Sequence, residues 1–178
     1  MKYAIKLSVF LGLVAAISTI ALAAANYVTA PIIAEYQAMR FTEAVEGAFP
    51  GHYSFDIIAT AAEGTTHSGY LVEVLEIFGE DNETLGFIYN KVVPGFGGPI
   101  TYVMGIGTDG NFVSFDVLSH SETPGFGARV ADEDEFENRL IGNYAGNQVD
   151  ILTGATNTTT PIIRAIGDLY QDFLGRVN

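Results

Sequence analysis

Hydroxyl side chains are concentrated in one short stretch near the carboxyl end of the chain, DILTGATNTTTP at residues 150–161. Five of its twelve residues are threonine. A threonine hydroxyl can cap a helix or close a turn by bonding to nearby backbone groups. It can also be esterified and carry a covalently attached phosphoryl group. The stretch is therefore either an ordinary lead into a helix or a site of covalent attachment.

Two glycine-rich loops precede this stretch, PGFGGPI at 94–100 and SHSETPGFGARV at 119–130. Glycine has no Cβ, so a ligand can approach its backbone closely. The start of a helix offers free amides and a positive dipole end, which suit a phosphate group. A phosphorylated ligand over these three loops is therefore reasonable, although plain turns explain glycine loops as well.

The segments that must position these loops are mostly β-strands. YLVEVLEIF (70–78) and TLGFIYNKVV (84–93) flank a polar turn, which predicts a hairpin. ITYVMGIG (100–107) and NFVSFDVL (111–118) flank TDG, a stronger turn signal. In the last segment Val113, Phe115 and Val117 alternate with polar residues, so we expect these three on one buried face.

Helices are expected on both sides of this β region, which makes the fold class α+β with a mainly antiparallel central sheet. Residues 31–47 have helical spacing and begin at Pro31, and the acidic start of 131–142 suits a helix N-terminus. We prefer that interpretation to a calcium loop and expect no metal site. The last helix should run from Pro161, with Thr160 as its N-cap. Its buried face should contain Ile162, Ile166, Leu169, Tyr170 and Phe173.

The first part of the chain has the composition of a membrane anchor. Lys2 and Lys6 precede a run at residues 7–25 that is apolar or small and uncharged, close to the roughly 20 residues that span a bilayer. The ALAAA sequence also offers a signal-peptidase site, but the run is longer than a signal peptide needs. We expect an uncleaved anchor at 1–28 followed by one domain at 29–178. Because no basic residue follows the run until Arg40, the N-terminus should stay cytoplasmic and the domain should be extracytoplasmic.

Charge and cysteine content narrow the possible functions of that domain. It carries six Lys or Arg against 21 Asp or Glu, a formal charge of −15, so nucleic acid is not an expected partner. The chain has no cysteine, which excludes disulfides, thiolate metal sites and cysteine nucleophiles. A redox role would therefore need a cofactor that cysteine does not hold.

The three loops together carry a more specific pattern. DILTGAT fits the flavinylation signature Asp-x-x-Ser/Thr-Gly-Ala-Thr, and SETPGFG fits a second loop that accompanies it. With GFGGPI and the N-terminal anchor, the chain closely resembles the FMN-binding subunits RnfG and NqrC of membrane-bound, ion-translocating redox complexes. The resemblance covers nearly the whole chain. RnfG is the better match, because this chain is short and NqrC members tend to carry insertions.

The resemblance implies that Thr156, the last threonine of the signature, bears FMN through a phosphoester bond. The cofactor site would also include two further loops. Phe126 stands where many relatives have leucine and would pack either against the flavin or in the core, while His120 is expected to be structural. The implied cofactor-binding residues besides Thr156 are Asp150, Leu152, Thr153, Gly154, Ala155, Glu122, Thr123, Gly125, Gly97 and Gly98.

By the same resemblance the chain is an electron-carrier subunit of an Rnf-type ferredoxin:NAD oxidoreductase in the inner membrane. A separate FMN transferase would install the flavin, so this chain needs no complete active site of its own. Its partners would be the bilayer and the other subunits, among them a multi-spanning flavoprotein. Two alternatives remain open at this stage. One is a stand-alone anchored flavin domain for extracellular electron transfer, and the other is an acidic interaction module without flavin.

Overall fold

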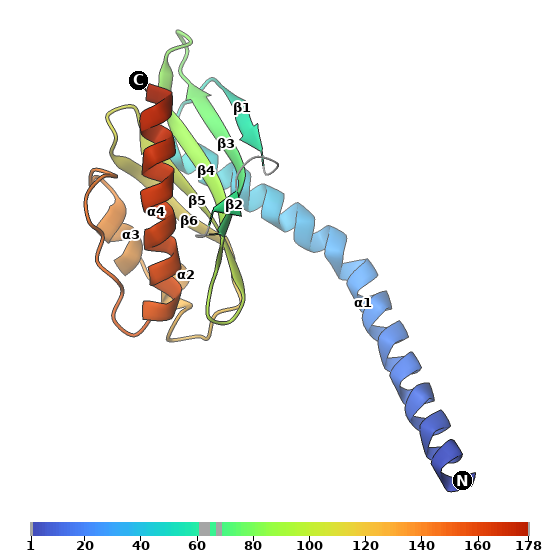
Figure 1. The fold of residues 1–178 in the computed structure, drawn as a ribbon. Coiled ribbons are helices and arrows are strands. Elements are labelled where there is room, and N and C mark those ends of the chain that lie inside the picture. The colour runs from blue at the N-terminus through green and yellow to red at the C-terminus, as the bar shows by residue number, and fades with distance from the viewer. Residues whose placement is uncertain (1, 61–64, 67–68, 178) are drawn as a thin grey trace. The chain divides into compact units, whose positions relative to one another are not determined.

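The computed structural model describes residues 2–60, 65–66 and 69–177 (Figure 1). The chain divides into two units, Met1–Met39 and Arg40–Asn178. The second unit contains a sheet with helices packed on it, as expected for the α+β class. All three loops singled out in the sequence lie in this second unit.

Helix α1 (Lys2–Ala48) runs from the first unit into the start of the second. Its apolar part, with mean hydropathy 2.3, has the length and composition to cross a membrane. The expected separate helix beginning at Pro31 is wrong, because α1 continues through this residue. A proline removes one backbone hydrogen bond, and a helix of 47 residues keeps enough others to tolerate that loss.

The sheet is antiparallel throughout, in the spatial order β1-β3-β4-β5-β6. Both hairpins expected from the turn signals are present, β3–β4 and β5–β6. No sequence pattern indicated the edge strand β1 or the short β2, which pairs with β3. The strand bounds are β1 (Ser54–Thr60), β2 (Thr65–Thr66), β3 (Gly69–Phe78), β4 (Thr84–Pro94), β5 (Pro99–Gly107) and β6 (Phe112–Ser119).

Both faces of the sheet are covered, each by its own apolar core. On β5, Tyr102 and Met104 point into the core under the last helix, whereas Val103 points to the opposite face. That opposite face packs against the end of α1 through Val45 and Ala48. The alternation of β5 therefore serves two cores, which explains why its residues are buried on both sides.

The expectation that Val113, Phe115 and Val117 of β6 share one buried face is wrong for Val113. Phe115 and Val117 lie in the core under the last helix, as expected, but Val113 packs against the other core. The cause is a shift in register, since Gly105 faces Ser114 but Ile106 faces Phe112. An extra residue in one strand turns the side chains that follow it to the other face.

The expected helix at 131–142 is two short helices, α2 (Arg129–Asp132) and α3 (Glu135–Leu140). The last helix, α4 (Thr156–Val177), begins five residues before Pro161, so the expected cap at Thr160 is wrong. Ala155 is buried in the core, and its carbonyl accepts the amides of Thr158 and Thr159 at 3.0 and 2.9 Å. Tertiary anchoring of Ala155 therefore starts the helix earlier than the proline signal indicates.

Helix α4 lies across one face of the sheet, drawn in red in Figure 1. Ile162, Ile166, Leu169 and Phe173 of its expected face are buried, and Phe173 meets Phe87 edge to face with ring centroids 6.0 Å apart. Tyr170 lies at the margin of the core, where its hydroxyl is 2.8 Å from that of Tyr144.

One lysine is buried beneath α4. The Lys91 ammonium on β4 lies 3.9 Å from a carboxylate oxygen of Asp168. Burial lowers the pKa of Lys91 below its ordinary value, and the carboxylates of Asp168 and Asp172 oppose that effect. The ammonium is thus held in an unfavourable environment by a long ion pair.

We predict that Lys91→Met leaves the free energy of unfolding unchanged or raises it by up to about 4 kcal/mol, because an apolar side chain of similar length needs no charge partner. Asp168→Asn should lower it, since the ammonium then loses its nearest carboxylate. Urea unfolding of the two variants measures both effects. A Met variant less stable than the parent by more than about 1 kcal/mol would contradict this view of the pair.

Candidate functional site

The three loops singled out in the sequence meet at one end of the sheet (Figure 1). They enclose a pocket of about 390 Å³. This volume lies within the roughly 300–1,000 Å³ that small-molecule sites occupy. The pocket is lined by Phe96 from the first loop, by Glu122, Thr123, Phe126 and Gly127 from the second, and by Gly154, Ala155, Thr156, Asn157 and Thr158 from the third.

The Glu122 carboxyl group connects all three loops. One of its oxygens accepts the backbone N–H of Gly97 at 2.8 Å, and the other accepts the hydroxyl of Thr158 at 2.5 Å. Glu122 is only 7% exposed, so both hydrogen bonds are shielded from water. A buried carboxyl group needs such partners, and here they come from positions 25 residues before it and 36 residues after it.

Two glycines make room for this carboxyl group. A side chain at Gly127 would overlap both the Glu122 carboxyl and the Thr158 hydroxyl. A side chain at Gly95 would overlap the other carboxyl oxygen. The glycines in these loops are therefore required for close packing around Glu122, which is a stronger reason than turn formation alone.

The second loop is a compact turn. The Thr123 carbonyl accepts the amides of Phe126 and Ala128, each at 3.2 Å, and Gly125 has a φ of +75° that favours glycine. His120 contributes as a structural residue, since its Nδ1 accepts the Glu122 amide at 3.2 Å. The turn holds Glu122 in place and presents the residues after it at the pocket.

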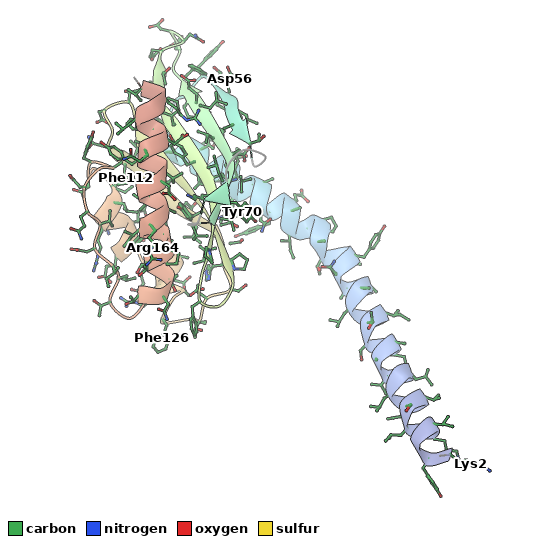
Figure 2. The ribbon with its side chains drawn as sticks, viewed as in Figure 1. Lys2, Asp56, Tyr70, Phe112, Phe126 and Arg164 are labelled. Carbon is green, nitrogen blue, oxygen red and sulfur yellow. The ribbon has the colours of Figure 1, made fainter. Side chains whose placement is uncertain are left out.

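The sequence left open whether Phe126 packs in the core or lies where it could contact a cofactor. Its side chain is 63% exposed and lines the pocket, so it does not fill the core. Figure 2 shows it projecting at the end of the domain where α4 begins. Phe96 of the first loop also lines the pocket and is 73% exposed. Two exposed aromatic side chains thus border a pocket that Gly127 and Gly154 also line.

The third loop is anchored from within. Leu152 and Ala155 are buried, and the Ala155 amide donates to the Leu152 carbonyl at 2.9 Å. Gly154 between them has a φ of +88°, which a residue with a side chain rarely adopts. The loop therefore has a fixed shape where it leads into α4.

The five threonines of this stretch differ sharply in their surroundings. Thr158 and Thr159 are buried, and their hydroxyls are bonded to Glu122 and to the Ala155 carbonyl. Thr160 is half-buried, whereas Thr153 and Thr156 are exposed. Of these two exposed residues, Thr156 lines the pocket and Thr153 does not.

Thr156 is also the first residue of α4. The first amides of a helix have no partner within it and give this end a partial positive charge. The amides of Thr158 and Thr159 bond to Ala155, which leaves those of Thr156 and Asn157 at the very start of the helix. An anionic group esterified to Thr156 would thus lie at the positive end of a 22-residue helix.

The structure brings together about half of the residues expected at the site. Glu122, Thr123, Gly154, Ala155 and Thr156 line the pocket, and Gly97 is bonded to Glu122 beside it. Contact of the cofactor with any of the expected residues stays a prediction, and five of them neither line the pocket nor bond to Glu122. These are Gly98, Gly125, Asp150, Leu152 and Thr153.

Sequence reasoning missed other lining residues, namely Phe96, Gly127, Asn157 and Thr158. Phe96 lies in a loop that was singled out for its glycines. The pairing of Thr158 with Glu122 joins residues far apart in the chain, so no local pattern announces it.

We predict that Glu122→Ala lowers the free energy of unfolding by about 2–4 kcal/mol, because it leaves the Gly97 amide and the Thr158 hydroxyl unpaired. Glu122→Gln should cost less than about 1 kcal/mol, since an amide can serve both partners. Urea unfolding measures both, with Glu80→Ala in the exposed turn after β3 as the control. Equal midpoints for the alanine variants at 122 and 80 would contradict the proposed importance of this carboxyl group.

Comparison with known proteins gives the same assignment as the motifs. Residues 95–171 match the model of the FMN-binding domain family. The G-type subunit of the Na⁺-translocating ferredoxin:NAD⁺ oxidoreductase complex of Acetobacterium woodii is 27% identical, over 93% of this chain and 82% of its own length. Two further relatives are G-type subunits of ion-translocating oxidoreductase complexes. The one from Methanosarcina acetivorans is 26% identical over 73% of each chain, and the one from Vibrio vulnificus is 34% identical over 43% of each chain. The expected resemblance is thus confirmed: residues 95–171 match the FMN-binding domain family, and the chain is similar to the G-type subunits of ion-translocating oxidoreductase complexes along most of its length.

Proposed function

We propose that this chain is an electron-carrier subunit of an Rnf-type, ion-translocating ferredoxin:NAD oxidoreductase and carries FMN as a phosphoester on Thr156. The family match supports FMN as the cofactor, and the similarity to G-type subunits supports the complex. The observation that carries the attachment site is that Thr156 alone, among the five threonines of its stretch, is both exposed and part of the pocket.

The residues present fit such a cofactor. Attachment forms a bond between the Thr156 Oγ and the FMN phosphorus, with the net loss of one water, and leaves a monoanionic diester at the start of α4. Gly154 and Ala155 before it are small, so a transferase can reach the hydroxyl. Covalent attachment also prevents loss of the cofactor from a domain outside the cytoplasm.

The rest of the pocket would hold the flavin ring. Phe96 and Phe126 offer aromatic surfaces, and the backbone at Gly154 permits close approach. Glu122 lines the pocket and would also act on the cofactor through the loops it holds, since its two oxygens bond to Gly97 and Thr158. The bound flavin supplies the electron-transfer chemistry, while the protein supplies orientation and electrostatics.

The proposed placement in the membrane is based on α1. We propose that residues 1–28 form a single-pass anchor with the N-terminus in the cytoplasm and that 29–178 lie outside it. Support comes from the apolar length of α1 and from Lys2 and Lys6, which precede its apolar run. Electrons would pass to and from other membrane subunits, including a multi-spanning flavoprotein. A separate FMN transferase would attach the flavin to Thr156.

We predict that Thr156→Ala abolishes flavin fluorescence of the denatured full-length protein on a gel, after expression with an FMN transferase. Thr156→Ser and Thr153→Ala should retain it, because the first keeps a hydroxyl at the pocket and the second changes an exposed residue outside it. The alanine variant at 156 should differ from the parent by no more than about 0.5 kcal/mol in urea unfolding, as expected for an exposed position. A fluorescent band from this variant would refute the attachment site.

We also predict that Phe126→Ala makes the bound flavin more accessible to iodide, a quencher of its fluorescence. Loss of an aromatic contact worth about 0.5–1.5 kcal/mol should raise the quenching constant by about two- to tenfold. Phe126→Leu should give a smaller rise, and Tyr53→Ala, at an exposed aromatic residue outside the pocket, should give none. Equal quenching of the parent and the Phe126→Ala protein would show that Phe126 does not cover the flavin.

A further inference from the structure

Two arginines hold the outer side of the loop that leads to Thr156. Arg129 of α2 donates from Nη1 to the Thr153 carbonyl at 2.9 Å. Arg139 of α3 donates from its own Nη1 to the Ile151 carbonyl at 2.8 Å and lies 3.5 Å from that of Asp150. Three carbonyls of four consecutive residues therefore face guanidinium groups from two other helices.

A single carboxylate joins the two arginines. One oxygen of Glu135 accepts Arg129 Nη2 at 2.8 Å, and the other accepts Arg139 Nη2 at 2.7 Å. Arg129 has a further partner in Glu133, at 2.9 Å from its Nε. Because the guanidinium fork is planar, bonds from several of its nitrogens fix both its position and its orientation. We call Arg129, Glu135 and Arg139 the arginine clamp.

The clamp contains two arginines, and basic residues are few in this part of the chain. Only six basic side chains follow the apolar run of this strongly acidic chain, and two of them serve this loop. Both are largely covered, with side chains 25% and 32% exposed. α2 and α3, which carry them, have four and six residues, so neither helix would be stable by itself. An isolated surface ion pair contributes little stability, and this network does more than pair charges because it also bonds to backbone.

The loop is consequently fixed from two sides. On its inner side, the Leu152 and Ala155 side chains are buried in the core. On its outer side, the clamp bonds to its backbone carbonyls. The next residue along the chain is Thr156. Holding a reacting group in one geometry can contribute strongly to the rate of its reaction, and a misplacement of about 1 Å can be costly. The arginines also pair with carboxylates that would otherwise repel an incoming flavin phosphate.

We infer that the arginine clamp positions the 150–156 loop so that the Thr156 hydroxyl is presented for flavin attachment. Arg129 and Arg139 act through the backbone of the loop and are positioning residues. The inference rests on the proposed attachment at Thr156, and it adds residues that belong to neither the signature stretch nor the pocket lining.

The test compares full-length Arg129→Gln, Arg139→Gln and Glu135→Gln with Arg176→Gln. Arg176 is the matched control, because it also forms an i,i+4 pair, with Asp172, near the far end of α4. Two readouts are taken. Hydrogen exchange of the amides at 152–157 is measured in protein made without a transferase, and the initial rate of flavin incorporation is measured at limiting FMN transferase.

Each arginine variant should exchange these loop amides about two- to tenfold faster, the factor that one lost hydrogen bond of about 0.5–1.5 kcal/mol represents. In the same variants the initial rate of flavin incorporation should fall. Excess transferase should still restore full labelling, because Thr156 is intact. Arg129→Lys should lie between the parent and Arg129→Gln, since an ammonium can reach a carbonyl but cannot serve two carboxylates in one plane. Arg176→Gln should change neither readout.

Unchanged exchange in both arginine variants would overturn the clamp. Faster exchange with an unchanged rate of incorporation would overturn its role in attachment while leaving Thr156 as the acceptor. If the parent protein takes up no flavin at all, the attachment site fails together with its positioning, and the exchange data still show whether the arginines hold the loop.

Discussion

The site depends on one buried carboxyl group. Glu122 accepts a backbone amide from the first loop and a hydroxyl from the start of α4, and it belongs to the second loop itself. Leaving either partner unpaired would cost free energy, because the group is shielded from water. Three loops that are separated in the chain by other segments are thereby held in fixed positions relative to one another. The pocket is a consequence of this constraint, since its lining comes from the same three loops.

The sheet and α4 give that constraint a rigid frame. Each face of the sheet has its own apolar core, so the strands that end at the loops cannot shift independently. α4 begins at Thr156 because Leu152 and Ala155 are buried ahead of it, and the arginines of α2 and α3 hold the same loop from outside. The exposed Thr156 hydroxyl therefore comes directly after a loop that is held from both sides. A cofactor bonded there would be attached to a fixed point of the domain.

Local patterns in the sequence predicted the parts of this structure that depend on local physics. The two hairpins followed from their turn residues, and the buried face of α4 followed from its helical period. Expectations failed where distant contacts decide. α4 starts before its proline because Ala155 is anchored in the core, and Val113 changes face because of a register shift against β5. The motifs placed Thr156 and Glu122 in one site, but nothing near Arg129 or Arg139 in the chain indicates that they bond to a loop beyond residue 149.

One hydroxyl, at the mouth of the pocket that Glu122 organises, is proposed to carry the cofactor. The most direct measurement is the intact mass of the native protein, followed by fragmentation of the peptide that contains residues 150–161. We expect the mass of the polypeptide plus FMN less one water, with the added mass on Thr156. A mass equal to that of the bare polypeptide, or the added mass on another residue, would contradict the proposal.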